Sequence, residues 1–261
     1  MKEYTFYSWN VNGIRAVGKK EALRWVDERH IDLLALQEIK AKKEQIPNDL
    51  FVKRFKHLFV NSASQPGRHG VAVFTDIDPY YSDDAHHIDT LKEGRINELH
   101  FKTPNNDVAF FNIYFPNGQM SEERLRYKLD FYARFIEYAQ SLRKEGKSII
   151  ICGDFNIAHK PIDLKRPKAN ENVSGFLPQE RAILDKMIEL GYIDTFRYIH
   201  GDIPHQYTWW SYKFNARKTN AGWRIDYFFV TEDLRDNIID ASIHAEIQGS
   251  DHCPISLQIA L

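Results

Sequence analysis

Two kinds of hydrophobic pattern alternate along the chain. Runs rich in aromatic and β-branched residues are typical of strands, and apolar residues at three- and four-residue steps are typical of helices. We expect strands at residues 4–9, 32–37, 69–75, 95–102, 107–115, 148–152, 225–230, 241–247 and 255–261. We expect helices at 19–29, at 121–144 and from Pro178 to near Gly191. Because each sheet must bury a face, this mixture predicts an α/β fold of two sheets packed face to face with helices outside.

The helical patterns also predict which side chains face inward. In the segment 121–144, which Gly146 follows, these are Leu125, Leu129, Tyr132, Ile136, Ala139 and Leu142. In the segment 19–29 they are Ala22, Leu23, Trp25 and Val26. The run SIIIC at 148–152 is apolar throughout, as in a strand covered on both faces.

Length and composition place the chain among ordinary globular proteins. Its 261 residues suit one large α/β domain over 1–261, and no repeat, low-complexity tract or Gly/Ser linker divides it. The net charge is −1, so a nucleic-acid partner would require basic groups gathered on one face. Cys152 and Cys253 stand apart, which favours two reduced, buried thiols. With no leader pattern or long apolar span, we expect a cytoplasmic protein, nucleoid-associated if the source is prokaryotic.

Polar residues follow several of the expected strands, where a rigid scaffold usually positions chemistry. In WNVNG (9–13), Asn10 and Asn12 would point the same way, although Asn-Gly also fits a simple turn. Glu38 ends the strand in LQE (36–38) and is either a solvated strand end or a metal ligand. In NIYFPNG (112–118), Tyr114 is either a packed tyrosine or part of a site.

The strongest of these signals is GDFN at 153–156. Asp154 follows a strand covered on both faces, and a buried carboxylate is costly unless it is paired, hydrogen-bonded or ligated. Asn156, two positions on, is available to orient the same ligand. Near the C-terminus, Asp226 lies inside an apolar strand, and Asp251 and His252 precede another. An Asp–His pair aimed at one pocket could hold a phosphate or move a proton.

Together these side chains suit a hard cation, because oxygen ligands select Mg²⁺ or Mn²⁺. They do not suit zinc, since no matching His/Cys set is present. No GxxxxGK[ST] motif is present either, which argues against nucleotide triphosphatase chemistry.

In order, WNVNG, LQE, NIYFPNG, GDFN, WRIDY and GSDHCP resemble the exonuclease III family of apurinic/apyrimidinic (AP) endonucleases. GFLPQER (175–181) and YTWWSY…NAGWRIDYFF (207–229) extend the resemblance from about residue 4 to residue 261. It implies a four-layer α/β sandwich of two mixed sheets flanked by helices, the fold of DNase I and the inositol phosphatases. It also implies Mg²⁺-dependent hydrolysis, with Mn²⁺ as a substitute, of the bond 5′ to an abasic site, with 3′–5′ exonuclease and 3′-end-trimming activity.

The resemblance also implies residue roles. Glu38 would be the main metal ligand, helped by Asn12 and Asp251, and Asp154 would orient or deprotonate the attacking water. Asn156, Asn10 and Tyr114 would hold the scissile phosphate, and Asp226 would orient His252 against a phosphate oxygen. The lesion pocket would comprise Trp209, Trp223 and Ile225, although tryptophans also serve as core. The implied DNA contacts are Arg15, Lys40, Arg95, Asn117, Met120, Arg166 and Lys213.

Two positions depart from the family pattern. The vertebrate branch has Asp where this chain has Asn12, which puts the sharing of metal affinity in doubt. That branch probes the duplex with an Arg and a Met from two loops, and the corresponding residues here are Met120, beside Gln119, and Lys213. The basic residues Arg15, Lys40, Arg68, Arg95, Lys165, Arg166, Lys168, Lys213, Arg217 and Lys218 lie near the motifs and would form a phosphate-tracking face if they share one side.

We therefore expect a monomer that acts on double-stranded DNA containing abasic sites and binds no membrane. One alternative is another phosphohydrolase of the same fold, such as a non-specific nuclease or a phosphoinositide phosphatase, because fold alone does not fix function. The Trp209/Trp223 pair and GFLPQER argue against it. A second alternative is a DNA-binding protein without activity, and the presence of every central carboxylate argues against that.

Overall fold

The computed structural model describes residues 1–47 and 54–261 and contains two six-stranded sheets. The order of the first sheet is β13 (Ile238–Ile243), β14 (Ile255–Ala260), β1 (Glu3–Asn10), β2 (Leu33–Gln37), β4 (Val71–Thr75) and β3 (His57–Asn61). The order of the second is β5 (Tyr81–Asp83), β6 (Ile96–Lys102), β7 (Asp107–Tyr114), β8 (Ser148–Asp154), β12 (Asp226–Thr231) and β9 (Tyr192–Asp194). Each sheet is mixed, because β1–β2 and β7–β8 are parallel and the other pairs are antiparallel.

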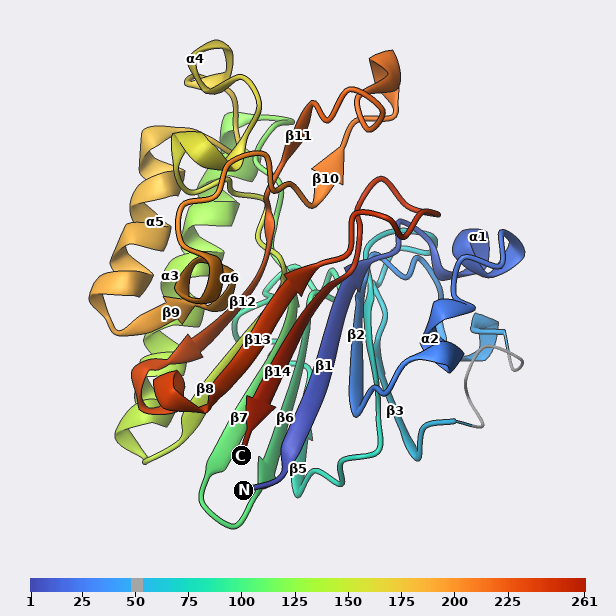
Figure 1. The fold of residues 1–261 in the computed structure, drawn as a ribbon, viewed down its shortest axis with the longest axis vertical. Coiled ribbons are helices and arrows are strands. Elements are labelled where there is room, and N and C mark those ends of the chain that lie inside the picture. The colour runs from blue at the N-terminus through green and yellow to red at the C-terminus, as the bar shows by residue number, and fades with distance from the viewer. Residues whose placement is uncertain (48–53) are drawn as a thin grey trace.

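Helices cover the outer face of each sheet, which makes four layers (Figure 1). On the second sheet lie α3 (Glu122–Lys144) and α5 (Pro178–Glu189), and on the first lie α1 (Ile14–Lys19) and α2 (Trp25–Glu28). The shorter elements are α4 (Pro167–Asn170), α6 (Thr195–His200), the hairpin β10 (Trp209–Trp210) and β11 (Gly222–Trp223), and 3₁₀ turns at Lys43–Gln45, Pro161–Asp163, Lys213–Asn215 and Glu232–Asn237. The expected four-layer sandwich of two mixed sheets is confirmed.

Three hydrophobic cores separate the four layers. Phe6 and Val73 of the first sheet pack with Phe110 and Cys152 of the second in the central core. One outer core joins α3 and α5 to the second sheet, and the other joins α1 and α2 to the first. Because β8 is covered on both faces, all of its residues are buried, as its apolar run predicts.

Some predicted boundaries are wrong. The segment 19–29 is not one helix: α1 ends at Lys19, Glu21 has a left-handed φ of 53°, and α2 is a single turn. The strand expected at 241–247 is β13, which begins at Ile238. In α3 the inward residues include Phe131 and Phe135, whereas Leu125, Leu129 and Ile136 are only half-buried. The helix therefore presents a different edge of its apolar stripe to the sheet than the leucine spacing predicts.

The strands β3, β5 and β9 to β11 and the helices α4 and α6 were not expected from the pattern. Most of them are too short for a periodicity to be recognised. In the described part of the chain, none of the helices is both long and apolar enough to cross a membrane.

Candidate active site

The polar residues predicted at strand ends meet at one edge of the two sheets. Asn10 ends β1 and Glu38 follows its parallel neighbour β2, while Tyr114 and Asp154 end the parallel pair β7 and β8. Asp226 begins β12, which runs antiparallel to β8, and the register pairs Asp226 with Asp154 directly. Strand direction alone therefore brings residues from distant parts of the sequence to one place.

An amide group of the first sheet joins two carboxylates. Asn10 Nδ2 donates to Glu38 Oε1 at 3.0 Å and to Asp154 Oδ2 at 2.9 Å. Glu38, Asp154 and His252 offer ligand atoms within 4.8 Å of one another, and among residues 1–47 and 54–261 no other group of three acidic, His or Cys side chains does so. The carboxylate oxygens of this cluster make this edge of the sheets the best candidate, among the described residues, for binding a divalent cation.

The two carboxylates have different electrostatic surroundings. Burial raises the pKa of Asp154 to about 7, against the opposing effect of His252 and with the help of Asp226. Burial also favours the neutral form of Glu38, but the Lys40 ammonium and the Asn10 amide outweigh it and lower the pKa of Glu38. In the absence of a cation, Glu38 is therefore ionised at neutral pH while Asp154 is poised to exchange a proton.

His252 and Asp226 form a buried pair. His252 Nδ1 lies 2.8 Å from Asp226 Oδ2, which also accepts a hydrogen bond from Thr208 Oγ1 at 2.6 Å. The other ring nitrogen, Nε2, lies 3.7 Å from Asp154 Oδ2. Burial opposes protonation of the imidazole, but Asp226 and Asp154 outweigh it and raise the pKa of His252 to about 10. The His252 ring is therefore a cation, and its Nε2 faces the Asp154 carboxylate.

Tyr114 is buried beside these groups and is held by Arg95. The Arg95 guanidinium lies 4.7 Å from the centre of the Tyr114 ring, and Nη1 donates to the Tyr114 carbonyl oxygen at 2.8 Å. Burial, Glu38 and Asp154 raise the pKa of Tyr114 well above its usual value, so the phenol keeps its proton. The expectation that Arg95 contacts DNA is wrong, because its side chain is only 1% exposed and is also paired with Glu93.

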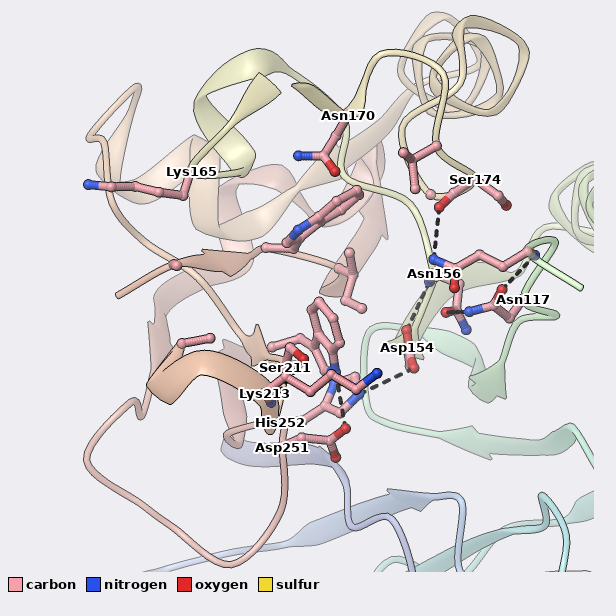
Figure 2. Close-up of a pocket in the computed structure, with 18 of the residues that line it drawn as sticks. Asn117, Asp154, Asn156, Lys165, Asn170, Ser174, Ser211, Lys213, Asp251 and His252 are labelled. Atoms are coloured by element: carbon pink, nitrogen blue, oxygen red, sulfur yellow. Dashed lines mark hydrogen bonds and ion pairs between the residues drawn. The ribbon is translucent and has the colours of Figure 1, made fainter. Parts of the chain in front are cut away.

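Asn156 lies in a tight turn after β8. Its φ is 52°. Its backbone N–H donates to Asp154 Oδ1 at 2.8 Å, and its side-chain Nδ2 donates to the Phe115 carbonyl oxygen at 2.9 Å. Asn117 Nδ2 donates to Asn156 Oδ1 at 3.1 Å, which links the NIYFPNG loop to this turn (Figure 2). Asn117 thus supports the turn and also lines the cavity.

Asn12 and Asp251 lie together at the side of the cluster. Asn12 Nδ2 donates to Asp251 Oδ1 at 2.9 Å, and Trp209 Nε1 donates to Asp251 Oδ2 at 3.1 Å. The Lys40 ammonium lies 2.9 Å from Glu38 Oε2 and donates to Asn12 Oδ1. Lys40 therefore bridges Glu38 to the Asn12–Asp251 pair.

A cavity of about 880 Å³ opens above these groups, lined by Asp154 and His252 at its base and by Trp209, Trp223 and Ile225 on one wall. The two indole rings meet edge to face, with their centres 6.4 Å apart. Trp209 and Trp223 are only half-buried, which distinguishes them from core tryptophans such as Trp9. All three residues of the predicted lesion pocket therefore line the same cavity.

Basic side chains lie at the rim. Lys165, Arg166 and Lys213 line the cavity, and Figure 2 shows the Lys165 amine directed away from Asp154. Arg15, Arg68, Lys168 and Lys218 are exposed. Arg217 is occupied, because it donates to the carbonyls of Ser250, Ala245 and Ile247. Met120 is 87% exposed and does not line the cavity.

Sequence reasoning missed several residues at this site. Phe214 lines the cavity although its side chain is 94% exposed, and it has a left-handed φ of 59°. A phenylalanine between Lys213 and Asn215 in a polar segment was the available signal. Asn170 and Ser174 also line the cavity, but they come from loops with no distinctive pattern.

Comparison with known proteins gives consistent matches. Residues 7–252 match the model of the Endonuclease/Exonuclease/phosphatase family. An exodeoxyribonuclease of Bacillus subtilis is 41% identical over 256 residues, covering 97% of this chain and 98% of that protein. A DNA repair nuclease APEX1 of Danio rerio is 37% identical, covering 97% of this chain and 81% of that protein. The solved structure of an AP endonuclease from Archaeoglobus fulgidus superposes with a TM-score of 0.86 at 27% identity, covering 99% and 100% of the two chains.

Proposed function

This chain belongs to the endonuclease/exonuclease/phosphatase family and to its AP endonuclease and exodeoxyribonuclease group of metal-dependent nucleases, and from that premise we propose that it incises double-stranded DNA 5′ to abasic sites. One observation carries the proposal. The carboxylate and imidazole groups suited to phosphodiester hydrolysis form the base of a cavity whose wall consists of Trp209, Trp223 and Ile225. The chemistry and the lesion pocket therefore share one space, formed by a single domain over residues 1–261.

The donor set fits Mg²⁺, with Mn²⁺ as a substitute. Glu38 and Asp154 place hard carboxylate oxygens close together, and the Lys40 ammonium beside Glu38 shows that the pocket already accommodates positive charge. Glu38 would hold the ion, helped by Asp251 and the Asn12 side-chain oxygen. When bound, the ion would stabilise the negative charge that develops on the phosphoryl and leaving oxygens.

Asp154 is the proposed base. Its Oδ1 is fixed by the Asn156 amide, and its Oδ2 faces His252, so a water above Oδ2 could transfer a proton to that oxygen. Its raised pKa suits this role, because a base works best when its pKa lies near the operating pH. Asn10 directs its amide group at both carboxylates, so we assign it to holding Glu38 and Asp154 in place rather than to phosphate contact.

The phosphate would be held by fixed donors. The His252 imidazolium, oriented by Asp226, would donate from Nε2 to a phosphoryl oxygen, and the protonated Tyr114 phenol and the Asn156 side chain would donate to the others. Loss of one such donor typically slows a reaction about a hundred- to a thousand-fold. These donors are fixed in advance by Thr208, Arg95 and Asn117, so little reorganisation accompanies the reaction.

Selectivity for the lesion would follow from the cost of extrusion. A nucleotide without its base loses no stacking or pairing when it turns out of the helix, so the Trp209–Trp223 wall receives it at the lowest cost. Arg15, Lys40, Arg166 and Lys213 would contact the DNA backbone, and the exposed side chains of Phe214 and Met120 would support the distorted duplex. The exodeoxyribonuclease relative supports an additional exonuclease activity, which we propose to run 3′–5′ and to include trimming of 3′ ends. We further propose that the protein acts as a monomer in the cytoplasm, close to the nucleoid in a prokaryote.

A nicking assay tests the proposal. The substrates are one 5′-labelled duplex with a single abasic site, the same duplex intact, a duplex ending in a 3′-phosphate, and an inositol polyphosphate. We expect incision 5′ to the abasic site in Mg²⁺, none in EDTA, and no release of phosphate from the inositol compound. Equal cleavage of the intact duplex would favour a non-specific nuclease, and full activity in EDTA would exclude the metal role of Glu38.

A further inference from the structure

A fully buried ion pair lies beneath the site. Lys128 of α3 and Glu180 of α5 are both 0% exposed, and Lys128 Nζ lies 2.6 Å from Glu180 Oε1. Neither residue lines the cavity. Because burying two charges costs about as much as their attraction returns, an apolar pair of similar volume would often serve stability equally well. Stability alone therefore does not account for this pair.

Lys128 is attached to the turn that carries the proposed base. Its Nζ also donates to the Asn156 carbonyl oxygen at 2.8 Å. The carbonyls on either side are held in the same way, that of Phe155 by the Tyr132 hydroxyl and that of Ile157 by the Tyr227 hydroxyl at 2.8 Å. Asn156 has a left-handed φ of 52°, which a non-glycine residue keeps only when its surroundings enforce it. These bonds fix the turn, and the Asn156 amide fixes Asp154 Oδ1.

Glu180 is attached to the cavity wall. Its Oε2 accepts from the Gly175 amide at 2.5 Å and from the Leu177 amide at 3.0 Å, and its Oε1 accepts from Ser174 Oγ at 2.8 Å. Gly175 has a φ of +100°, and a Cβ on it would lie 3.3 Å from Trp223 Cζ3. The chain at 174–175 therefore packs closely against the Trp223 indole, in the position that Glu180 sets.

We propose that Lys128 and Glu180 are a positioning pair that couples the turn carrying Asp154 and Asn156 to the wall formed by Gly175 and Trp223. The inference rests on the proposed function for the identity of the reaction. Neither residue touches the substrate; each acts through the backbone that it holds. A displacement of about 1 Å at a reacting group can cost roughly a hundred-fold in rate, so a rigid connection between base and pocket has a kinetic effect.

Three variants test the pair. Lys128→Met removes the positive charge and the hydrogen-bond donors, whereas Lys128→Arg keeps both. Glu180→Gln removes the negative charge but keeps one acceptor oxygen. Thr231→Val is the control, because it removes a buried hydroxyl that accepts the Ile149 amide at the opposite end of β8 from Asp154. On the abasic duplex we expect Lys128→Met to lower kcat at least about tenfold with a much smaller change in KM, and Lys128→Arg to retain most of kcat. Thr231→Val should lose stability with kcat unchanged.

Amide spectra of ¹⁵N-labelled protein without metal or DNA give a readout independent of activity. In Lys128→Met the Leu177 and Asn156 resonances should both shift, because the Leu177 amide donates to Glu180 and the Asn156 carbonyl accepts from Lys128, and in Thr231→Val neither should. An inactive wild-type protein would contradict the proposed function, but the comparison of amide spectra between the variants would remain valid. Unchanged Leu177 resonances in Lys128→Met, or a kcat within twofold of wild type, would overturn the proposed coupling. Unfolding of all three variants would show a purely structural role and overturn it as well.

Discussion

The Lys40 ammonium lies 2.9 Å from Glu38 Oε2, so a side chain of the protein occupies the surroundings of the carboxylate that we assign to the metal. An entering divalent cation must share or displace this charge. Lys40 is about one-third exposed, with 32% of its side chain accessible, so it has room to move outward. The relationship implies competition between an internal cation and the metal.

Lys40→Met should therefore bind Mg²⁺ more tightly. Removal of a nearby like charge lowers the electrostatic cost of the ion, and we expect the dissociation constant to fall about tenfold, which corresponds to about 1.4 kcal/mol. Isothermal titration of the DNA-free protein measures it, and Lys43→Met, an exposed lysine in the same segment, is the control. Weaker binding in Lys40→Met would mean that Lys40 supports the site rather than competes for it.

Asp154→Asn should abolish nicking while leaving the binding of abasic DNA largely intact. Loss of a general base typically slows a reaction about a hundred- to ten-thousand-fold. Asparagine keeps the oxygen that accepts the Asn156 amide, so the turn should persist. Single-turnover nicking and gel-shift binding on the same duplex separate the two effects, and a wild-type rate in this variant would refute the assignment.

Asp226→Asn should lower the pKa of His252 from its value of about 10, because the carboxylate is the main group that raises it. Asp154 remains 3.7 Å from the ring, so the shift should be partial. NMR titration of the His252 imidazole in the metal-free protein measures the pKa. If activity needs the imidazolium form of His252, the alkaline limb of the pH–activity profile should move to lower pH in Asp226→Asn. An unchanged His252 titration would contradict this account of the pair.

Trp223→Ala should reduce selectivity for the lesion. The ring forms the cavity wall with Trp209, and its loss removes apolar contact with the extruded sugar, so kcat/KM on the abasic duplex should fall roughly tenfold. Trimming of a 3′-phosphate should be less affected if it depends less on that wall. Tyr198→Ala, which removes an aromatic ring that is 46% exposed on α6, should change neither. Equal losses on both substrates would argue for a general folding defect.

Asp163 should contribute to stability in a defined pH range. Burial opposes its ionisation, but Arg224 and Arg197 outweigh this and lower its pKa to about 2 in the folded state, against 3.8 as the ordinary value. Because the folded pKa is the lower one, the contribution is present above about pH 4 and disappears as the pH falls through 2. It should amount to about 2 kcal/mol. Urea unfolding across this range measures it, and Asp163→Asn should flatten the dependence; an equally steep dependence in the variant would assign the effect to other carboxylates.

The alternation of strands and helices, and the identity of the residues at strand ends, can be read from the sequence. Period and composition are local properties, so β1, β7, β8 and α5 are readable without a structure. Asp154 was identifiable because it follows an all-apolar strand, and a buried carboxylate is costly unless it is paired, hydrogen-bonded or ligated. The ordered motifs then indicated the family, and with it a set of candidate site residues.

Which of these groups meet, and which are held apart, depends on contacts that form only in the folded protein. Asn10 joins Glu38 to Asp154 across 28 and 144 residues of chain, and no periodicity encodes such a contact. Arg95 reads as a surface cation, yet it is buried against Tyr114. Lys128 reads as the polar side of a helix, yet it is buried against Glu180. The physical reason is the same in each case: whether a charge is solvated or paired depends on the atoms that folding brings around it, and those atoms come from distant segments.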